Sequence, residues 1–179
     1  MKEISKITGR EYRPFDYYGA PDAEDIIVAM GSVTDTIEET IDYLNSKGYK
    51  VGVIKVRLYR PFSEKYFFDV MPETVKRIAV LDRTKEPGAL GEPLYLDVKS
   101  LYYEAANKPV IVGGRYGLGS KDVKPNQIFA VFENLKAADP KDGFTIGIED
   151  DVTNLSLPLP KSINTEDPSA IRCKFWGLG

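Results

Sequence analysis

The feature that most constrains the fold is a regular alternation of short apolar runs with amphipathic stretches after residue 25. Each run is short, rich in β-branched residues and bounded by polar or turn residues, which predicts strands covered on both faces. These strands are expected at residues 26–30, 50–59, 77–81, 109–113 and 144–148, with helices at 34–47, 63–70, 94–106 and 125–137. Strands that alternate with helices predict a mostly parallel sheet with helices on both faces, an α/β fold.

The helix at residues 34–47 has the clearest local signals. Thr34 or Asp35 is expected to cap its start, and Glu38 lies three residues after Asp35, as a capping box requires. Gly48 follows as a normal stop. Its apolar residues share one face at i, i+4 and i+7: Ile37, Ile41 and Leu44.

Two strands are expected to be irregular. The apolar register of residues 50–59 slips between Val53 and Ile54, which predicts a bulge or an early end. A further strand is expected near residues 11–17, and Pro14 limits it to a sheet edge.

The two ends of the sequence follow a different pattern. Residues 1–8 predict a short helical end, in which Ile4 and Ile7 are too few apolar positions for an independent helix. From Glu149 onward the alternation stops, and Pro, Ser, Thr and Asn predict a connecting segment. Residues 171–179 are apolar and aromatic, as at the opening of another element, so the chain is expected to be an excerpt.

Two absences restrict the chemistry of the chain. It has no histidine and a single cysteine, Cys173. A Ser-His-Asp triad, a His-ligated zinc site, an internal disulfide and a complete Cys-ligated iron–sulfur cluster are therefore excluded within it. The net charge of −3 and the lack of a basic stripe indicate no nucleic-acid partner. No apolar run is long enough for a bilayer, so no membrane partner is expected and a cytoplasmic location is the default.

The carboxyl ends of the strands are where ligands of open α/β sheets usually bind. After the fourth expected strand comes the segment GGRYGLGSK, residues 113–121. Its glycines have phosphate-loop spacing, but a P-loop needs Gly-Lys-Ser/Thr and this chain has Gly-Ser-Lys, which argues against a Walker ATPase. A looser anion site at Arg115, Ser120 and Lys121 is one interpretation. A structural turn with paired charges is the other, and it is favoured.

A mixed-charge loop follows the third expected strand, at residues 82–93. Its charged residues are Asp82, Arg83, Lys85, Glu86 and Glu92. A catalytic interpretation would use Glu86 or Glu92 as an acid or base. A docking loop that pairs its charges across an interface is favoured, because no nucleophile or set of metal ligands accompanies the carboxylates.

Three consecutive acidic residues, Glu149, Asp150 and Asp151, are a weaker candidate for a cation site. Side chains on an extended segment diverge alternately, and the EF-hand spacing is missing. No metal site is therefore predicted.

Four segments carry a strong resemblance to one family. In order they read GAPDAEDIIVAMGSVTDTIEETIDYLNSKGYKVGVIKVRLYRPF, IAVLDRTKEPGALGEPLYLDV, VGGRYGLGSKD and FTIGIEDDVTNLSLP. Together they resemble the second domain of pyruvate:ferredoxin (flavodoxin) oxidoreductases, over about residues 10–179. The resemblance implies a three-layer α/β/α sandwich with a mostly parallel, five-stranded mixed sheet, similar to the C-terminal domain of transketolase.

The resemblance also implies a parent reaction. The family decarboxylates pyruvate on thiamine diphosphate with Mg, passes electrons through [4Fe–4S] clusters to ferredoxin or flavodoxin, and forms acetyl-CoA from coenzyme A. The thiamine pocket and the clusters belong to other domains, so no catalytic residue and no cofactor is carried over to this chain. The implied partners are the other domains of the enzyme, which is expected to be a homodimer.

The expected domain limits follow from the same resemblance. Residues 1–9 are similar to the tail of a preceding domain, residues 10–150 to the transketolase-like domain, and residues 151–179 to a linker and the start of the next domain. The expected role is a non-catalytic scaffold that docks neighbouring domains. A stand-alone module that binds an anion such as coenzyme A is the alternative, and a small independent enzyme is the weakest, because no nucleophile–base pair is visible.

Overall fold

A six-stranded sheet forms the centre of the computed structural model, which describes residues 1–106, 108–149, 151–160, 162–167 and 169–177. The strands are β1 (Phe15–Gly19), β2 (Asp25–Met30), β3 (Val51–Val56), β4 (Arg77–Asp82), β5 (Val110–Arg115) and β6 (Phe144–Thr145). Their order is β1-β3-β2-β4-β5-β6, in which β1 is antiparallel to β3 and all other pairs are parallel. The predicted mostly parallel mixed sheet is confirmed, with six strands instead of five.

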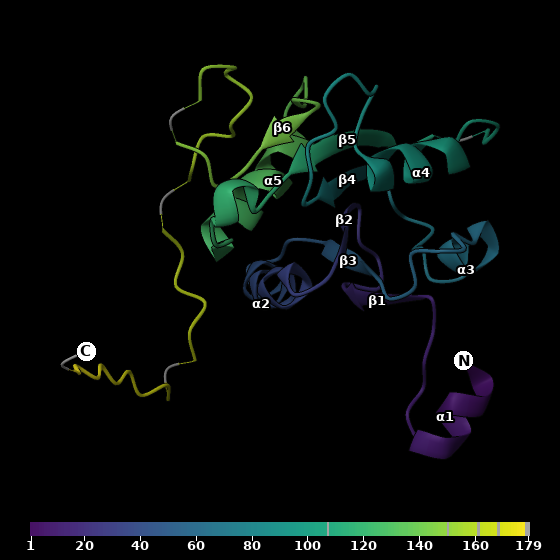
Figure 1. Cartoon of the computed structure of the whole chain (residues 1–179), viewed down its shortest axis with the longest axis horizontal. Coiled ribbons are helices and arrows are strands. Elements are labelled where there is room, and N and C mark those ends of the chain that lie inside the picture. Colours follow the sequence, from purple (N-terminus) through teal and green to yellow (C-terminus); the bar gives the residue numbers. More distant parts are fainter. Residues whose placement is uncertain (107, 150, 161, 168, 178–179) are drawn as a thin grey trace.

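Helices cover both faces of this sheet (Figure 1). They are α2 (Val33–Ser46), α3 (Glu64–Phe68), α4 (Pro93–Leu101) and α5 (Pro125–Lys136), while α1 (Lys2–Thr8) stands apart from the sheet. A short 3₁₀ turn, Leu118–Ser120, follows β5. The three-layer α/β/α arrangement is therefore the predicted one.

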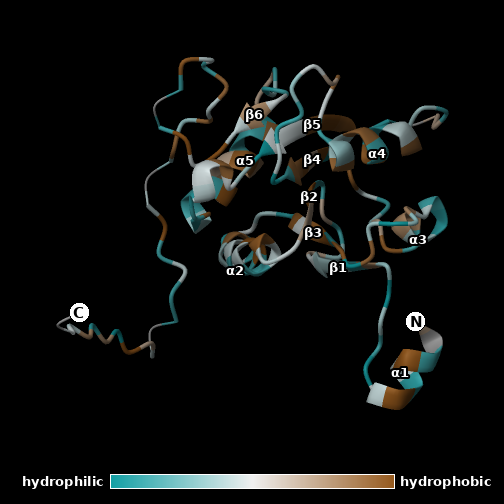
Figure 2. Ribbon diagram, in the orientation of Figure 1, coloured by the Kyte–Doolittle hydropathy of each residue, from teal (hydrophilic) through white to brown (hydrophobic). Residues whose placement is uncertain are grey.

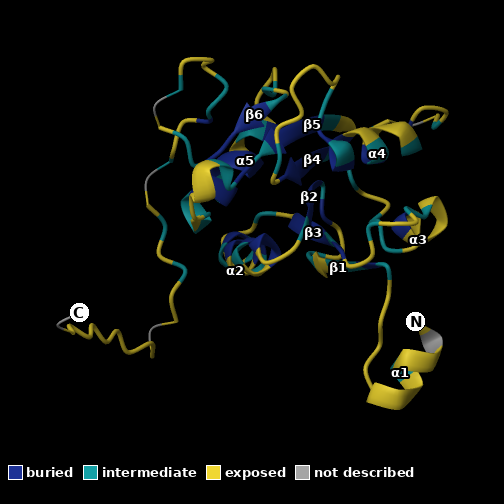
Figure 3. Ribbon diagram, in the orientation of Figure 1, coloured by how far each residue is buried: buried dark blue, intermediate teal, exposed yellow. Residues whose placement is uncertain are grey.

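Two hydrophobic cores lie on opposite faces of the strands, because successive side chains of a strand point to opposite sides. Ile27 of β2 packs in the core under α2 and α5, whereas its neighbour Ile26 packs in the core under α3 and α4. Val53 and Ile54 of β3 divide in the same way. The apparent register slip at these two residues is therefore explained by a strand that is buried on both faces. Figures 2 and 3 show these central strands as hydrophobic and buried.

The start of α2 differs from the predicted capping box. Ser32 is the N-cap, and the Thr34 hydroxyl donates to the carbonyl of Gly31 at 2.8 Å. Asp35 therefore lies inside the first turn, and Glu38 forms a salt bridge with Lys55 of β3. The capping-box prediction is wrong because a tertiary partner takes the Glu38 carboxylate.

Several predicted boundaries shift. β3 ends early, at Val56, and the next two backbone N–H groups both donate to the carbonyl of Pro14. β1 consequently begins after Pro14 rather than before it. The helix predicted at residues 94–106 ends at Leu101. The strand predicted at 144–148 ends at Thr145, two residues before Gly147 adopts a φ of +84°.

Residues 151–160 return to the sheet edge and then leave it. Thr145 forms a parallel bridge with Ser156, which extends the edge beside β6. Beyond this bridge the described chain runs away from the sheet (Figure 1). Among the described residues, no helix has the length and apolar character that crossing a bilayer requires.

Candidate functional site

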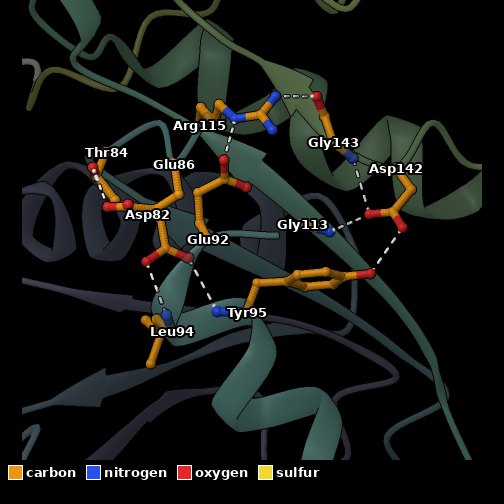
Figure 4. A network of polar contacts seen from close by, with 10 residues as sticks. All are labelled: Asp82, Thr84, Glu86, Glu92, Leu94, Tyr95, Gly113, Arg115, Asp142 and Gly143. Atoms are coloured by element: carbon orange, nitrogen blue, oxygen red, sulfur yellow. Dashed lines mark hydrogen bonds and ion pairs between the residues drawn. The ribbon is translucent and has the colours of Figure 1, made fainter. Parts of the chain in front are cut away.

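Asp82 ends β4 and fixes the start of α4. Its two carboxylate oxygens accept the backbone N–H groups of Leu94 at 3.0 Å and Tyr95 at 3.1 Å (Figure 4). The carboxylate lies at the N-terminus of α4, where the positive end of the helix dipole stabilises a negative charge. Burial nevertheless raises the pKa of Asp82, while the two N–H donors act in the opposite direction. Asp82 thus joins the two ends of the loop between β4 and α4 by hydrogen bonds.

Glu92 and Arg115 form a second buried contact at the same edge. Arg115 is the last residue of β5, and its Nε lies 2.6 Å from Glu92 Oε1. Its Nη1 donates to the carbonyl of Gly143 at 2.9 Å. The side chains are 3% exposed for Glu92 and 16% for Arg115, so both charges are largely withdrawn from water. This pair connects the start of α4 with β5 and with the segment that enters β6.

A third contact centres on Asp142, which sequence reasoning missed. Its Oδ1 accepts the backbone N–H groups of Gly113 at 2.7 Å and Gly143 at 2.9 Å, and its Oδ2 accepts the hydroxyl of Tyr95 at 2.8 Å. Lys99 also donates to that hydroxyl, at 2.5 Å. The turn-forming dipeptide Asp142-Gly143 is the one sequence signal at this position.

The loop between these buried anchors is exposed. Arg83, Lys85 and Glu86 are all exposed, and Leu90 is 98% exposed. The backbone N–H of Ala89 donates to the carbonyl of Glu86 at 3.2 Å. Pro87 and Gly88, with φ +84° at Gly88, suit the two central positions of a type II turn. A turn therefore orders residues 86–89 of the loop, while its charged and apolar side chains face solvent.

The neighbouring loop after β5 is in contact with it. Gly117 has a φ of +63°, and a Cβ placed there would lie 2.9 Å from Arg83 Nε. The side chain of Arg83 therefore lies against Gly117. Tyr116 connects the same loop to β2, because its hydroxyl donates to the carbonyl of Met30 at 3.1 Å. We call the two loops, residues 83–91 and 116–121, the docking edge.

The structure thus divides the predicted docking residues into two groups. Asp82, Glu92 and Arg115 are engaged in contacts within the chain. The other three are exposed: Arg83, Lys85 and Glu86. Within the described part of the chain, Arg83 and Lys85 have no salt bridge, while Glu86 accepts a hydrogen bond from Thr84 at 3.2 Å.

The predicted anion-site residues are not gathered around one cleft. Arg115 contacts Glu92 and Gly143, as described above. Ser120 and Lys121 are exposed, and Lys121 lines a cleft of about 520 Å³. The other residues that line this cleft are Asp122, Lys124, Gln127, Gly147, Ile148 and Glu149, so acidic as well as basic groups face it.

The acidic run after β6 is described at two of its three positions. Asp150 lies outside the described residues. Asp151 accepts hydrogen bonds from Thr153 and Ser156, which hold the pKa of its carboxyl well below the usual range. No group of three or more His, Cys, Asp or Glu side chains is placed to hold a metal ion in the described ranges.

Comparison with known proteins identifies relatives over the whole chain. The chain is 62% identical over 180 residues to a pyruvate-flavodoxin oxidoreductase of Enterobacter agglomerans and 58% identical over 179 residues to a pyruvate:ferredoxin oxidoreductase of Moorella thermoacetica. Both alignments cover 100% of this chain and 15% of the relative. The chain therefore spans about 15% of the length of the curated relatives it matches.

A solved structure and a family model also match the chain. The structure is a 2-oxoglutarate:ferredoxin oxidoreductase from Magnetococcus marinus, with a TM-score of 0.48 and 18% identity over 76% of this chain and 22% of that one. The model that matches residues 23–128 is described as pyruvate:ferredoxin oxidoreductase core domain II. These residues include most of the sheet and all of the loop that follows β4. The chain belongs to the pyruvate:ferredoxin oxidoreductase core domain II family.

Proposed function

We propose that this chain is the second domain of a longer pyruvate:ferredoxin (flavodoxin) oxidoreductase, in which it docks neighbouring domains and contributes no catalytic residue. One observation supports this docking role most directly. The buried charges at the carboxyl edge of the sheet are paired inside the chain, whereas the loop that they fix presents Arg83, Lys85 and Leu90 to solvent. A loop that is already ordered before binding loses less conformational entropy when it meets a partner.

The longer enzyme, under this proposal, oxidises pyruvate to acetyl-CoA and carbon dioxide and passes the electrons to ferredoxin or flavodoxin. It works as a cytoplasmic homodimer with thiamine diphosphate, Mg and [4Fe–4S] clusters held by its other domains. The residues of this chain do not fit such a cluster, which takes four cysteine thiolates where the chain has one, Cys173. No step of the reaction is therefore assigned to this chain.

The chemistry of the docking edge defines its partner surface. Arg83 and Lys85 are exposed cations without a salt bridge in the described part of the chain, so acidic groups on the neighbouring domain would complement them. The fully exposed Leu90 would enter an apolar depression between those groups.

Substitution of Arg83 in the full-length enzyme tests this role. Loss of a charge that is buried and paired at an interface costs about 2–5 kcal/mol, so Arg83→Ala should weaken domain association and lower turnover several-fold. Lys47→Ala is the matched control, because Lys47 is an exposed cation at the end of α2, away from the docking edge. Unchanged assembly and turnover in Arg83→Ala would refute the docking role.

The anion-binding alternative draws less support from the geometry. Arg115 is committed to Glu92, and the cleft beside Lys121 also holds Asp122 and Glu149. We therefore expect coenzyme A to leave the melting temperature of the isolated chain unchanged, since a ligand that binds the folded state would raise it. A rise that depends on the concentration of coenzyme A would favour the alternative.

A further inference from the structure

An apolar surface, separate from the docking edge, lies beside the edge strand β1, at the opposite side of the sheet from β6. It is a groove of about 910 Å³, and its apolar lining includes Tyr12, Phe15, Leu58, Tyr66 and Val70. Leu58, Tyr66 and Tyr12 are 37%, 48% and 41% exposed. Exposed apolar side chains that gather in this way mark interaction surfaces more often than isolated ones do.

The helix α1 forms the other wall of this groove and leaves its own apolar face open. Met1, Ser5 and Lys6 line the groove, while Ile4 is 54% and Ile7 is 84% exposed. Figure 1 shows α1 standing away from the sheet, and Figure 3 shows most of its described residues as exposed. A helix of seven residues is too short to be stable by itself in water, so its stability has to come from packing.

Four of the charged side chains around the groove form two ion pairs. Lys6 Nζ lies 3.3 Å from Glu3 Oε1, and Arg13 Nη2 lies 2.6 Å from Glu11 Oε1. Each pair brings opposite charges together. Asp69 also lines the groove and has no salt bridge among the described residues, so the side-chain charge that is left on the rim is that of this one carboxylate. The groove therefore favours an apolar occupant over a charged one.

We infer that the groove receives an apolar segment from another domain of the same longer polypeptide. The same domain would cover Ile4 and Ile7, which lie on the side of α1 that does not line the groove. This inference rests on the proposed function, which makes the chain one domain of a larger enzyme. The whole chain aligns with only 15% of each of its relatives, so the length needed to supply such a segment exists in this family. The groove is distinct from the docking edge, because β3 and β2 lie between β1 and β4.

Photo-crosslinking in the full-length polypeptide tests this occupant. Benzoylphenylalanine replaces Tyr66, which lines the groove, and separately Tyr103, which is 79% exposed and does not line it. The expected product from position 66 is an intrachain crosslink to a residue outside the segment that corresponds to this chain. A crosslink between two copies, crosslinks confined to this segment, or a yield no higher than from position 103 would each overturn the inference.

A substitution provides an independent readout. Ile7→Ser alters a side chain that is exposed in the described structure, so it should lower the melting temperature of the full-length polypeptide only if another domain covers Ile7. We expect a fall of several degrees, with no change for Val152→Ser, whose side chain is 92% exposed on another loop. Equal melting temperatures for both variants would contradict the inference. The proposed docking function would then still be supported if Arg83→Ala alone impaired assembly.

Discussion

At the scale of single residues, the contact between Glu92 and Arg115 joins the end of one loop of the docking edge to the start of the other. Both side chains are largely buried, at 3% and 16% exposure. Removal of one partner leaves the other charge buried without compensation, which costs about 3–5 kcal/mol. The pair therefore stabilises the two loops. Because the two side chains bind each other, neither is available to a ligand.

We expect Glu92→Gln to lower the free energy of unfolding of the chain by about 3 kcal/mol, as measured by urea denaturation. The matched control is Glu11→Gln, because Glu11 pairs with Arg13 at the surface, where the side chains are 70% and 55% exposed. Exposed pairs contribute little, so the control should unfold like the wild type. Equal effects of the two substitutions would show that the Glu92 contact is not important for stability.

The burial of Tyr102 predicts that the free energy of unfolding falls as the pH becomes strongly alkaline. It is 8% exposed, and burial raises its pKa from 10.0 to about 12. The folded state therefore holds the phenolic proton more tightly than the unfolded state. The resulting stability is complete below about pH 10 and is lost as the pH rises through about 12.

We expect Tyr102→Phe to reduce the loss of unfolding free energy between pH 10 and 12 by about 2–3 kcal/mol, since two pKa units correspond to that difference. Chemical denaturation at several pH values measures it. Tyr103→Phe, at the exposed neighbouring position, should leave the pH profile as in the wild type. An unchanged profile in Tyr102→Phe would contradict the assignment.

Sequence reasoning located part of the polar network and missed the rest. Asp82 and Arg115 are predictable because they follow the ends of expected strands, where functional groups concentrate, and Glu92 because it belongs to the mixed-charge loop after one of these strands. Asp142 was not predicted, because its partners Gly113 and Tyr95 lie 29 and 47 residues away in sequence. Which of the six predicted docking residues are engaged within the chain and which are exposed also depends on tertiary packing, which no local sequence pattern records.

At the scale of elements, the pairing of β5 with β6 depends on a residue without a side chain. A Cβ at Gly114 would lie 2.2 Å from Phe144 Cζ and 2.9 Å from Leu81 Cδ2. Phe144 is fully buried, so it has little room to move away. The close approach of these two strands therefore requires glycine at this position.

We expect Gly114→Ala to destabilise the chain by about 1–3 kcal/mol, as overpacking of a core usually does. Thermal unfolding of the chain measures the change. Gly113→Ala is a useful comparison, because its Cβ would lie 3.0 Å from the ring of Tyr95, a less severe contact. A larger effect at Gly113 than at Gly114 would contradict this account of the β5–β6 contact.

Most elements were predictable because most strands contain a short apolar run and the major helices have a 3.6-residue period. Element ends were less predictable. The helix α4 ends at Leu101, five residues before the predicted limit, where backbone bonds from Tyr102 and Tyr103 to Lys99 and Ser100 tighten the turn. β6 is shorter than predicted because Gly147 turns the backbone. Both ends depend on how the chain returns to the sheet.

At the scale of the whole molecule, two surfaces remain open on a well-packed sheet. The docking edge presents a fixed loop with exposed cations, and the groove beside β1 presents apolar side chains. An isolated globular protein would have little reason to keep both uncovered. We therefore expect this chain to pack against other domains of a longer protein, such as the relatives of which it spans 15%.

Hydrogen exchange of the loop at residues 83–91 tests this central claim most directly. The measurement compares the isolated chain with the full-length enzyme, peptide by peptide, under the same conditions. We expect the amide groups of this loop to exchange at least tenfold more slowly in the full-length enzyme, because a neighbouring domain covers them. Equal exchange rates in the two proteins would show that the loop stays open to solvent, and the docking role would be wrong.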